Sequence, residues 1–531
     1  MHTDRTAGIL LPLFSMPSTR SWGIGEIGDL VTMAGWLREA GVGVLQLLPT
    51  NEMAPGQTSP SSAISAMALD PIYISLPDVY DFKAFGGEAR LDLADQVAIR
   101  ASRNATRVDY ASVRRVKEHA LRLAFSHFWD TEWVRGTARA GSFAAFCSWE
   151  EWWLADYALY RALRERSGGH SWTEWDAPLR RRDADALEEA RDELATEILF
   201  YQYLQWLADE QWQDAREAAR PVALFGDFPF MVALDSADVW ARQYLFRFDA
   251  TVGVPPDAFS ATGQDWGLPV YRWDVMEQDG YRWLRQRAKR SARLFDGFRI
   301  DHLVGFYRTY SRLLGEADGS FDPVEQEDQL AQGERLMAIF TSSGARVIAE
   351  DLGVVPDFVR ESLLRLGIPG YKVLRWERDW DADGQPFRDP AEYPALSVAT
   401  TGTHDTDPVA IWWETAPVAE REAFAELPQL ARYFAGIPPA SAPFTPALRD
   451  EILRALYSSA SGLLLIPIQD IFGWSDRINT PATVTDDNWT WRLPWAVDTL
   501  SGQPEARERM ETLRDWAEET GRMAEEVQDA G

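Results

Sequence analysis

Residues 295–306 read Phe-Asp-Gly-Phe-Arg-Ile-Asp-His-Leu-Val-Gly-Phe. The first half has the pattern of a short buried strand, and Arg299, Asp301 and His302 follow at its C-terminal end. Such groups resist burial unless they are paired. Arg299 and Asp301 are two residues apart and point to one side of a strand, so the guanidinium can hold the carboxylate ionised. An Arg–Asp pair that only closes the strand end fits this segment equally well.

Strand patterns recur along the chain, and helical patterns separate them. The expected strands are residues 8–14, 42–48, 222–227, 297–301, 347–351, 371–376, 396–405 and 463–468. Several of them end in acidic residues. This alternation predicts an α/β fold, a (β/α)8 TIM barrel whose functional site lies at the carboxyl ends of the strands. A doubly wound open sheet is the alternative, and the acidic strand ends fit it less well.

A long segment interrupts this alternation after the second strand. Residues 50–80 are rich in turn residues, and residues 85–215 have a helical pattern with repeated Trp, Arg and Glu. We therefore expect residues 1–51 to begin the barrel, residues 52–219 to form an inserted, mostly helical subdomain, and residues 220–531 to complete the barrel. The sequence contains no low-complexity linker and no internal repeat, which favours one compact unit.

Composition narrows the classes of function. The chain has 531 residues, of which 46% are hydrophobic, enough for a large core. Its 24 Trp residues include, we expect, some that line a sugar-binding site. The net charge of −29 argues against nucleic acid or an anionic membrane as a partner. The single Cys147 excludes an internal disulfide and fits a reducing compartment.

The N-terminal region has a weak similarity to a signal peptide. An apolar run at residues 7–14 follows Arg5, but it contains Pro12 and lacks a small-residue cleavage site. It is also too short to span a bilayer, and no other segment approaches that length. We therefore expect a cytoplasmic protein.

Two further acids resemble Asp301 in their setting. Glu350 ends the apolar run at residues 347–349, and Asp405 ends the segment Thr-Thr-Gly-Thr-His-Asp at residues 400–405. A carboxyl group that leaves a buried strand into a cleft has its pKa raised by desolvation, as a general acid requires. Each acid alone also fits a helix cap or an ion pair. Together, with His302 and His404 beside two of them, they suit a retaining glycosyl transfer.

Several long motifs occur in a characteristic order. They are residues 153–159, 226–229, 253–267, 298–302, 349–353, 401–405, 478–481 and 488–494. Through these motifs nearly the whole chain resembles the amylomaltases, the 4-α-glucanotransferases of glycoside hydrolase family 77 in the α-amylase clan. The resemblance implies that Asp301 is the nucleophile, Glu350 the acid/base and Asp405 the transition-state stabiliser.

The resemblance also implies how the substrate is held. The expected contacts with glucan are Arg299, His302, His404, Asp227, Asp257, Gln264, Trp266 and Asn479. Residues 253–267 would form a lid that favours a sugar acceptor over water. The implied donors are maltooligosaccharides and glucans derived from starch or glycogen, and glucose is an acceptor. No metal or organic cofactor is implied. An α-amylase-like hydrolase and a non-catalytic glucan-binding protein are the alternatives.

The sequence departs from the family pattern at three positions. Ser61 stands where the family usually has a Tyr that stacks on sugar, in Ser-Pro-Tyr-Gln. Leu268 replaces a common Asn after Trp266-Gly267, and Thr406 follows Asp405 where Asn is frequent. We expect these changes to affect chain-length preference, acceptor choice and the fraction of hydrolysis.

Overall fold

A parallel barrel forms the centre of the computed structural model, which describes residues 5–54, 56–256, 263–481, 483 and 485–524. The strand order is β12-β11-β10-β9-β6-β3-β2-β1-β13, and every pairing in it is parallel. The strands are β1 (Gly8–Leu10), β2 (Val44–Gln46), β3 (Ala223–Phe228), β6 (Gly297–Ile300), β9 (Arg346–Ala349), β10 (Gly370–Val373), β11 (Ser397–Thr400), β12 (Leu463–Leu464) and β13 (Ile466–Pro467).

The barrel closes through its last strand position. Only Leu465 separates β12, which pairs with β11, from β13, which pairs with β1. The two ends of the sheet, β12 and β13, therefore belong to one continuous segment and together form the eighth strand of the barrel. This closure confirms the predicted (β/α)8 barrel and is incompatible with an open doubly wound sheet.

The strands are shorter than the sequence patterns suggested. The predicted strand at residues 8–14 ends at Leu10, and a short 3-10 helix follows at Leu13–Ser15, because Pro12 has no N–H to continue a ladder. The predicted strand at residues 396–405 ends at Thr400. Its last residues form turns, in which the Thr400 hydroxyl donates to the carbonyl of Gly402 at 2.6 Å. Asp405 therefore lies on a loop beyond the strand.

The barrel interior contains its own apolar cluster. Val44, Phe225, Ile348, Tyr371 and Val398, from five different strands, pack together with Leu463 and Leu465. The Phe225 ring needs a glycine beside it, since a Cβ on Gly297 would lie only 2.5 Å from Phe225 Cζ. The larger core lies outside the barrel, between the strands and the surrounding helices.

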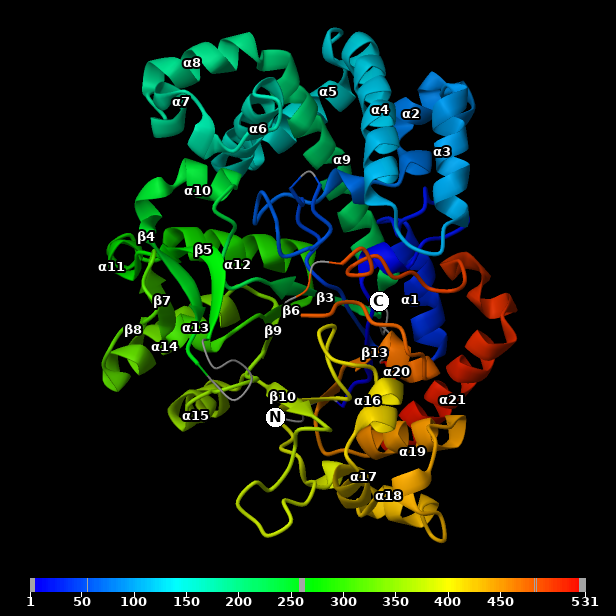
Figure 1. Cartoon of the computed structure of the whole chain (residues 1–531). Coiled ribbons are helices and arrows are strands. Elements are labelled where there is room, and N and C mark those ends of the chain that lie inside the picture. Colours follow the sequence, from blue (N-terminus) through cyan, green and yellow to red (C-terminus); the bar gives the residue numbers. More distant parts are fainter. Residues whose placement is uncertain (1–4, 55, 257–262, 482, 484, 525–531) are drawn as a thin grey trace, which may run out of the picture.

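Helices cover the outside of the barrel (Figure 1). Those packed around it include α1 (Asp29–Glu39), α12 (Arg282–Leu294), α14 (Gln326–Thr341), α15 (Asp357–Leu366), α19 (Pro446–Tyr457) and α21 (Pro504–Thr520). Helix α12 shows why: its buried side includes Trp283, Leu284, Ala288 and Leu294, at helical spacing, and it packs on β3 and β6.

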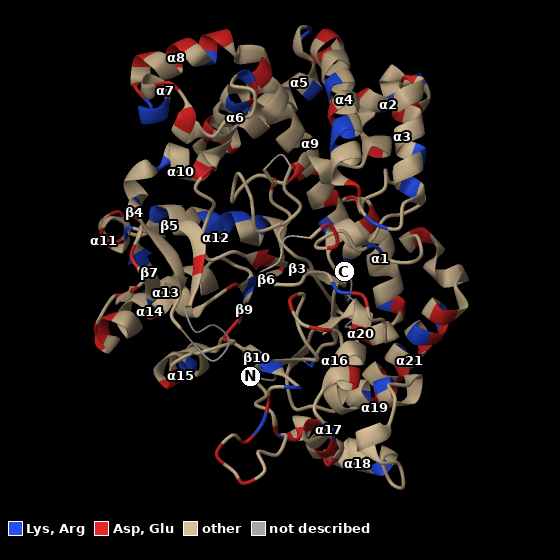
Figure 2. Ribbon diagram, in the orientation of Figure 1, with Lys and Arg blue, Asp and Glu red and all other residues tan. Residues whose placement is uncertain are grey.

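Between β2 and β3 the chain forms a group of helices above the barrel in the view of Figure 1. They are α2 (Tyr80–Phe85), α3 (Leu93–Asn104), α4 (Tyr110–Phe128), α5 (Ala138–Trp149), α6 (Glu151–Arg166), α7 (Ala177–Arg181), α8 (Ala184–Glu193) and α9 (Ala195–Ala219). Helix α9 packs on both α6 and β3, so it joins this group to the barrel wall. The acidic excess of the chain is visible on outer helices such as α8 and α21 (Figure 2).

A second, antiparallel sheet was not expected from the sequence. It has the order β5-β4-β7-β8 and consists of β4 (Phe246–Val254), β5 (Gln264–Tyr271), β7 (Thr309–Leu313) and β8 (Ser320–Asp322). The β4–β5 hairpin contains both ends of the predicted lid, and residues 257–262 of that lid lie outside the described part of the chain. In the described residues no helix is long and apolar enough to cross a membrane.

Candidate active site

The predicted catalytic acids follow the carboxyl ends of barrel strands. Asp301 comes directly after β6 and Glu350 directly after β9. Their backbone N–H groups still donate to neighbouring strands, Asp301 to the carbonyl of Phe228 at 3.0 Å and Glu350 to that of Ile300 at 3.0 Å. These bonds extend the ladder by one residue and fix where both carboxyl groups leave the sheet.

Arg299 holds two carboxylates at the rim of the barrel. Register pairs it with Asp227 on β3, and its Nη1 donates to both Asp227 oxygens at 2.9 and 2.8 Å. Its Nη2 lies 2.9 Å from Asp301 Oδ1. Burial opposes the Arg299 charge, but the carboxylates of Asp227, Asp301 and Glu350 outweigh it, and the pKa of Arg299 lies well above its usual value. The predicted Arg299–Asp301 pair is therefore present, and Asp227 completes it.

Asp301 remains accessible although Arg299 is buried. The side chain of Asp301 is 42% exposed, against 7% for Arg299 and 5% for Asp227. Burial raises the pKa of Asp227 above its ordinary value, despite the opposing charge of Arg299. The Asp227 carboxylate thus anchors the guanidinium of Arg299, while the Asp301 carboxylate is accessible to solvent.

Glu350 has the electrostatic setting of a general acid. Burial raises its pKa to about 7, the negative charge of Asp301 adds to the shift, and Arg299 opposes it. The backbone N–H of His302 donates to Glu350 Oε2 at 2.9 Å, which orients the carboxyl group. A group with this pKa can hold a proton and release it near neutral pH.

His302 is fixed between aromatic rings. Its backbone is left-handed, with φ of 45°, and its ring centroid lies 4.8 Å from that of Trp266 and 5.5 Å from that of Phe230. Burial lowers the pKa of His302 to about 4, although Asp301 opposes the shift. The imidazole is therefore neutral at neutral pH, and it can donate one hydrogen bond and accept another.

Asp405 is held by groups from a distant segment. Asn479 Nδ2 donates to Asp405 Oδ1 at 2.6 Å, and Arg477 Nη2 donates to the Asp405 carbonyl at 3.0 Å. His404 Nε2 lies 3.3 Å from Asp405 Oδ2, and the His404 ring lies 5.7 Å from that of Trp489. The Asp405 side chain is 44% exposed. The structure thus brings Asn479, His404 and Asp405 together.

One cavity connects the strand ends. It has a volume of about 490 Å³ and contacts Glu350, Arg299 and Asp405. Trp376 and Trp412 supply aromatic surface, and Arg375 and Arg477 supply further cations. Sequence reasoning did not identify these four residues as part of the site. Two of them had a signal in the sequence. Trp376 ends the segment predicted as the sixth strand, and Arg477 lies two residues before Asn479, which was a predicted substrate contact.

The remaining predicted contacts lie on the β4–β5 hairpin. Gln264 and Trp266 are on β5, and the Trp266 indole N–H donates to Gln264 Oε1 at 3.1 Å. Trp266 reaches the barrel rim through its edge contact with His302. Asp257 lies outside the described residues.

The three departures from the family pattern differ in their surroundings. Ser61 is exposed, and its backbone N–H donates to Ser59 Oγ at 3.4 Å. Leu268 is half-buried in β5 and packs against the main core. Thr406 contacts the 490 Å³ cavity, and its hydroxyl accepts from the Thr403 N–H at 2.9 Å. Of these three residues, only Thr406 lines the 490 Å³ cavity.

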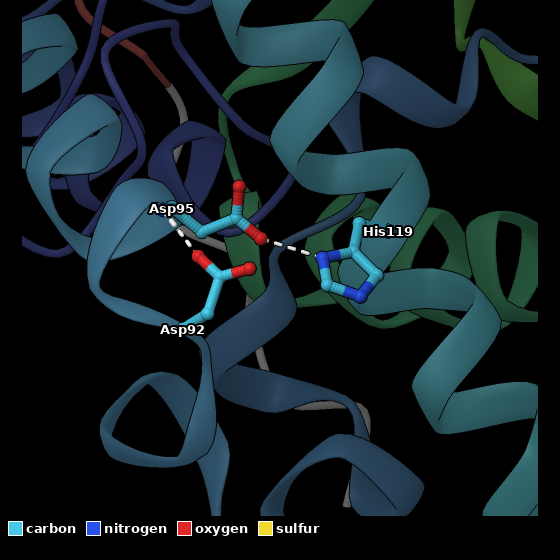
Figure 3. A group of neighbouring side chains, drawn as sticks. All are labelled: Asp92, Asp95 and His119. Atoms are coloured by element: carbon cyan, nitrogen blue, oxygen red, sulfur yellow. Dashed lines mark hydrogen bonds and ion pairs between the residues drawn. The ribbon is translucent and has the colours of Figure 1, made fainter.

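A cluster on the inserted helices has a donor set that resembles a metal site. Asp92, Asp95 and His119 lie together near α3 and α4 (Figure 3). Asp92 caps α3 by accepting from the Asp95 N–H at 2.8 Å. Asp95 is already paired with Arg115 at 2.7 Å and with His119 at 2.5 Å. These partners explain the cluster as a contact between α3 and α4.

Comparison with known proteins identifies the family to which this chain belongs. The family model described as 4-alpha-glucanotransferase matches residues 11–498. The chain belongs to this family, glycoside hydrolase family 77. It is 36% identical to the 4-alpha-glucanotransferase of Thermus thermophilus over 98% of this chain and 100% of that one. It is 35% identical to the Synechocystis sp. 4-alpha-glucanotransferase over 93% and 94% of the two chains.

Solved structures of the family have the same fold. The amylomaltase from Streptococcus agalactiae in complex with acarbose superposes with a TM-score of 0.80, at 27% identity, over 98% of this chain and 100% of that one. The predicted family, fold and 4-alpha-glucanotransferase activity are confirmed by these matches. The hydrolase and the non-catalytic binding protein are not favoured.

Proposed function

We propose that this enzyme transfers α-1,4-glucan segments by a retaining double displacement, with Asp301 as nucleophile, Glu350 as acid/base and Asp405 as stabiliser. The observation that carries the proposal is the contrast between two neighbouring acids. Arg299 Nη2 lies 2.9 Å from Asp301 Oδ1, and the Asp301 side chain is 42% exposed, whereas burial raises the pKa of Glu350 to about 7. Two carboxyl groups with such different environments suit a nucleophile and a proton donor.

In the first step, an Asp301 oxygen attacks the anomeric carbon of the donor sugar. The bond from that carbon to the leaving 4-oxygen breaks, and Glu350 gives its proton to this oxygen. A glycosyl ester with Asp301 results, and the glucan fragment with the new 4-OH departs. Asp405, which Asn479 and His404 position, faces the positive charge that develops on the sugar ring.

In the second step, the 4-OH of an acceptor sugar attacks the same carbon. Glu350, now ionised, takes the hydroxyl proton, and the ester bond to Asp301 breaks. The two inversions give net retention. Because its pKa is about 7, Glu350 can donate in the first step and accept in the second near neutral pH.

We propose that several residues near the strand ends hold the donor sugar. Arg299 and the neutral His302 border the reacting centre, and Asp227 accompanies Arg299. The β4–β5 hairpin brings Trp266 against His302. An aromatic cover at this point reduces access of water and so favours a sugar acceptor.

The substrates we propose are maltooligosaccharides and glucans from starch or glycogen as donors, with glucose or an oligosaccharide as acceptor. We place the reaction in the cytoplasm. The composition supports this, because the single cysteine, Cys147, leaves the chain without an internal disulfide.

The decisive experiment is incubation of the enzyme with maltotriose. We expect glucose together with maltooligosaccharides longer than the substrate. Asp301→Ala should lower this activity by several orders of magnitude. The melting temperature should stay close to that of the wild type, because Asp301 is 42% exposed and the buried Arg299 keeps its two bonds to Asp227. Asp249→Ala is the matched control, since that residue is an exposed acid on β4 that pairs only locally with Arg247.

Two results would overturn the proposal. Near wild-type transfer by Asp301→Ala would remove Asp301 as the nucleophile. Release of glucose and maltose from maltotriose, without longer products, would make the enzyme a hydrolase.

A further inference from the structure

The antiparallel sheet beside the barrel contains an irregular pairing in its β4–β5 hairpin (Figure 1). Two successive residues of β4, Val252 and Gly253, pair with Leu268 and Asp265 of β5. The residues between these two partners, 266–267, are therefore an insertion of two residues in β5, a β-bulge. A bulge bends its strand and changes the direction in which side chains point, and bulges are common next to active sites.

The bulge places the side chain of Trp266 against the catalytic rim. Gly267 has a left-handed backbone, with φ of 65°, which glycine adopts without strain. The rings of Trp266 and His302 have centroids 4.8 Å apart and an interplanar angle of 79°. His302 directly follows Asp301, and its backbone N–H donates to Glu350 Oε2 at 2.9 Å. The position of the indole therefore affects how the reacting centre is covered.

The carboxylate of Asp265 closes the bulge. Its Oδ1 accepts from the backbone N–H of Gly267 at 2.9 Å and from the hydroxyl of Thr251 at 2.7 Å. Arg312 Nη2 lies 3.2 Å from Asp265 Oδ2. The pKa of Asp265 lies below its ordinary value, chiefly because the Thr251 hydroxyl and the Gly267 N–H donate to the carboxylate. The group is therefore ionised at neutral pH and joins the bulge to β4 and β7.

Strand register brings Thr251 and Arg312 to this carboxylate. Arg312 on β7 pairs with Thr251 on β4, so the two side chains lie on the same face of the sheet. Gly253 lies two residues after Thr251 and therefore belongs to that face as well, and its partner on β5 is Asp265. The contacts of Asp265 thus follow from the pairing of three strands.

These contacts fix geometry more than they stabilise the fold. The side chain of Asp265 is 44% exposed, and that of Arg312 is 20% exposed. An ion pair with an exposed partner contributes little to the free energy of unfolding. The same carboxylate nevertheless holds the backbone on the far side of the bulge, directly after Trp266.

We propose that Asp265 is a positioning residue that determines how the glycosyl ester on Asp301 is divided between a sugar acceptor and water. By closing the bulge, Asp265 keeps the Trp266 ring against His302, where the indole reduces the access of water to the ester. The inference rests on the proposed function, because it concerns the second step of that reaction.

The two outcomes of the second step differ in a countable product. In both, an oxygen attacks the anomeric carbon, Glu350 takes the proton of that oxygen, and the bond to Asp301 breaks. When the oxygen is the 4-OH of a sugar, the total number of reducing ends stays constant. When it belongs to water, one new reducing end appears. The ratio of hydrolysis to transfer can therefore be measured directly.

The test measures this ratio with maltotriose. In Asp265→Ala the ratio of new reducing ends to lengthened maltooligosaccharides should rise by roughly twofold to tenfold, the effect expected when one hydrogen bond that holds the indole in place is lost. Asp265→Asn keeps an oxygen that can accept from Gly267 and Thr251, so its ratio should lie between those of Asp265→Ala and the wild type. Arg312→Met removes the ionic partner and should also raise the ratio.

Asp249→Ala is the matched control, because Asp249 is an exposed acid of the same hairpin that pairs locally with Arg247 at 3.1 Å. Its ratio should equal that of the wild type. A rise in this control as large as that in Asp265→Ala would overturn the inference, since any change in the hairpin would then have the same effect.

A wild-type ratio in Asp265→Ala and Arg312→Met would also overturn the inference. This holds even if their total activity or melting temperature falls, because Asp265 would then only stabilise the hairpin. If Asp265→Ala does not fold, Asp265→Asn and Arg312→Met decide the matter. Failure of the proposed function looks different: the wild type itself would not lengthen maltotriose.

Discussion

Arg299→Lys should show how much activity depends on the contact that orients Asp301, because the variant keeps the positive charge beside Asp301 but loses that contact. The native guanidinium makes two contacts with Asp227, at 2.9 and 2.8 Å, and one with Asp301 at 2.9 Å. Lysine keeps the positive charge but has no planar fork with which to hold both carboxylates. We expect its ammonium to stay with the buried Asp227, so that Asp301 loses its contact.

The magnitude follows from that single lost contact. A hydrogen bond to a charged group contributes about 1.5–3 kcal/mol. If the contact acts mainly in the transition state, kcat for maltotriose disproportionation should fall by roughly 10- to 150-fold, because each ~1.4 kcal/mol is a factor of ten. KM should change little. The basic limb of the pH profile should remain near that of the wild type, since the charge that acts on Glu350 is preserved.

The opposite end of the same strand supplies a matched control. Asp296, just before β6, is held by Arg216 through Nε at 3.0 Å and Nη2 at 2.7 Å. Arg216→Lys removes a comparable two-point pairing far from the carboxyl rim, and it should affect melting temperature without affecting kcat. If Arg299→Lys retained kcat within about twofold of the wild type and folded normally, Arg299 would not orient the nucleophile and the reasoning would be refuted.

Two further predictions concern proton transfer and sugar binding. Glu350 must be protonated to act as the acid, so kcat/KM should fall as pH rises through about 7. Arg299→Met should move this basic limb to higher pH, because the positive charge that lowers the Glu350 pKa is removed. A pH–rate profile without a limb between about 6 and 8 would contradict the assignment of Glu350 as the acid. Ser61→Tyr should lower KM by roughly twofold to tenfold and leave kcat unchanged, because a stacking contact away from the reacting ring stabilises the ground state and the transition state equally. An unchanged KM for maltotriose and for longer oligomers would show that an aromatic ring at position 61 does not contact the glucan.

Much of the barrel was predictable because its signal is local. Each strand position appeared as a short apolar run, and the two best-defined acids, Asp301 and Glu350, directly follow β6 and β9 as expected. Strand lengths were less accurate. Residues 396–405 looked like one strand, but β11 ends at Thr400, because side-chain hydrogen bonds of threonine compete with the ladder.

The many tryptophans show a different limit of sequence reasoning. Composition suggested sugar platforms, and Trp266, Trp376 and Trp412 do lie at the rim or the cavity. Others, such as Trp212 and Trp240, are completely buried in the core. An indole ring serves both purposes, and only its surroundings distinguish them.

The sequence by itself determined which chemical groups are present, the order of the strands and the family, because motifs and periodicity depend on neighbouring residues. Tertiary structure decided the pairing of Arg299 with Asp227, 72 residues away, and of Asn479 with Asp405, 74 residues away. It also decided the pKa of Glu350, since burial is the largest cause of that shift. Burial and long-range contacts depend on how distant segments pack around the barrel, and no local pattern records that packing.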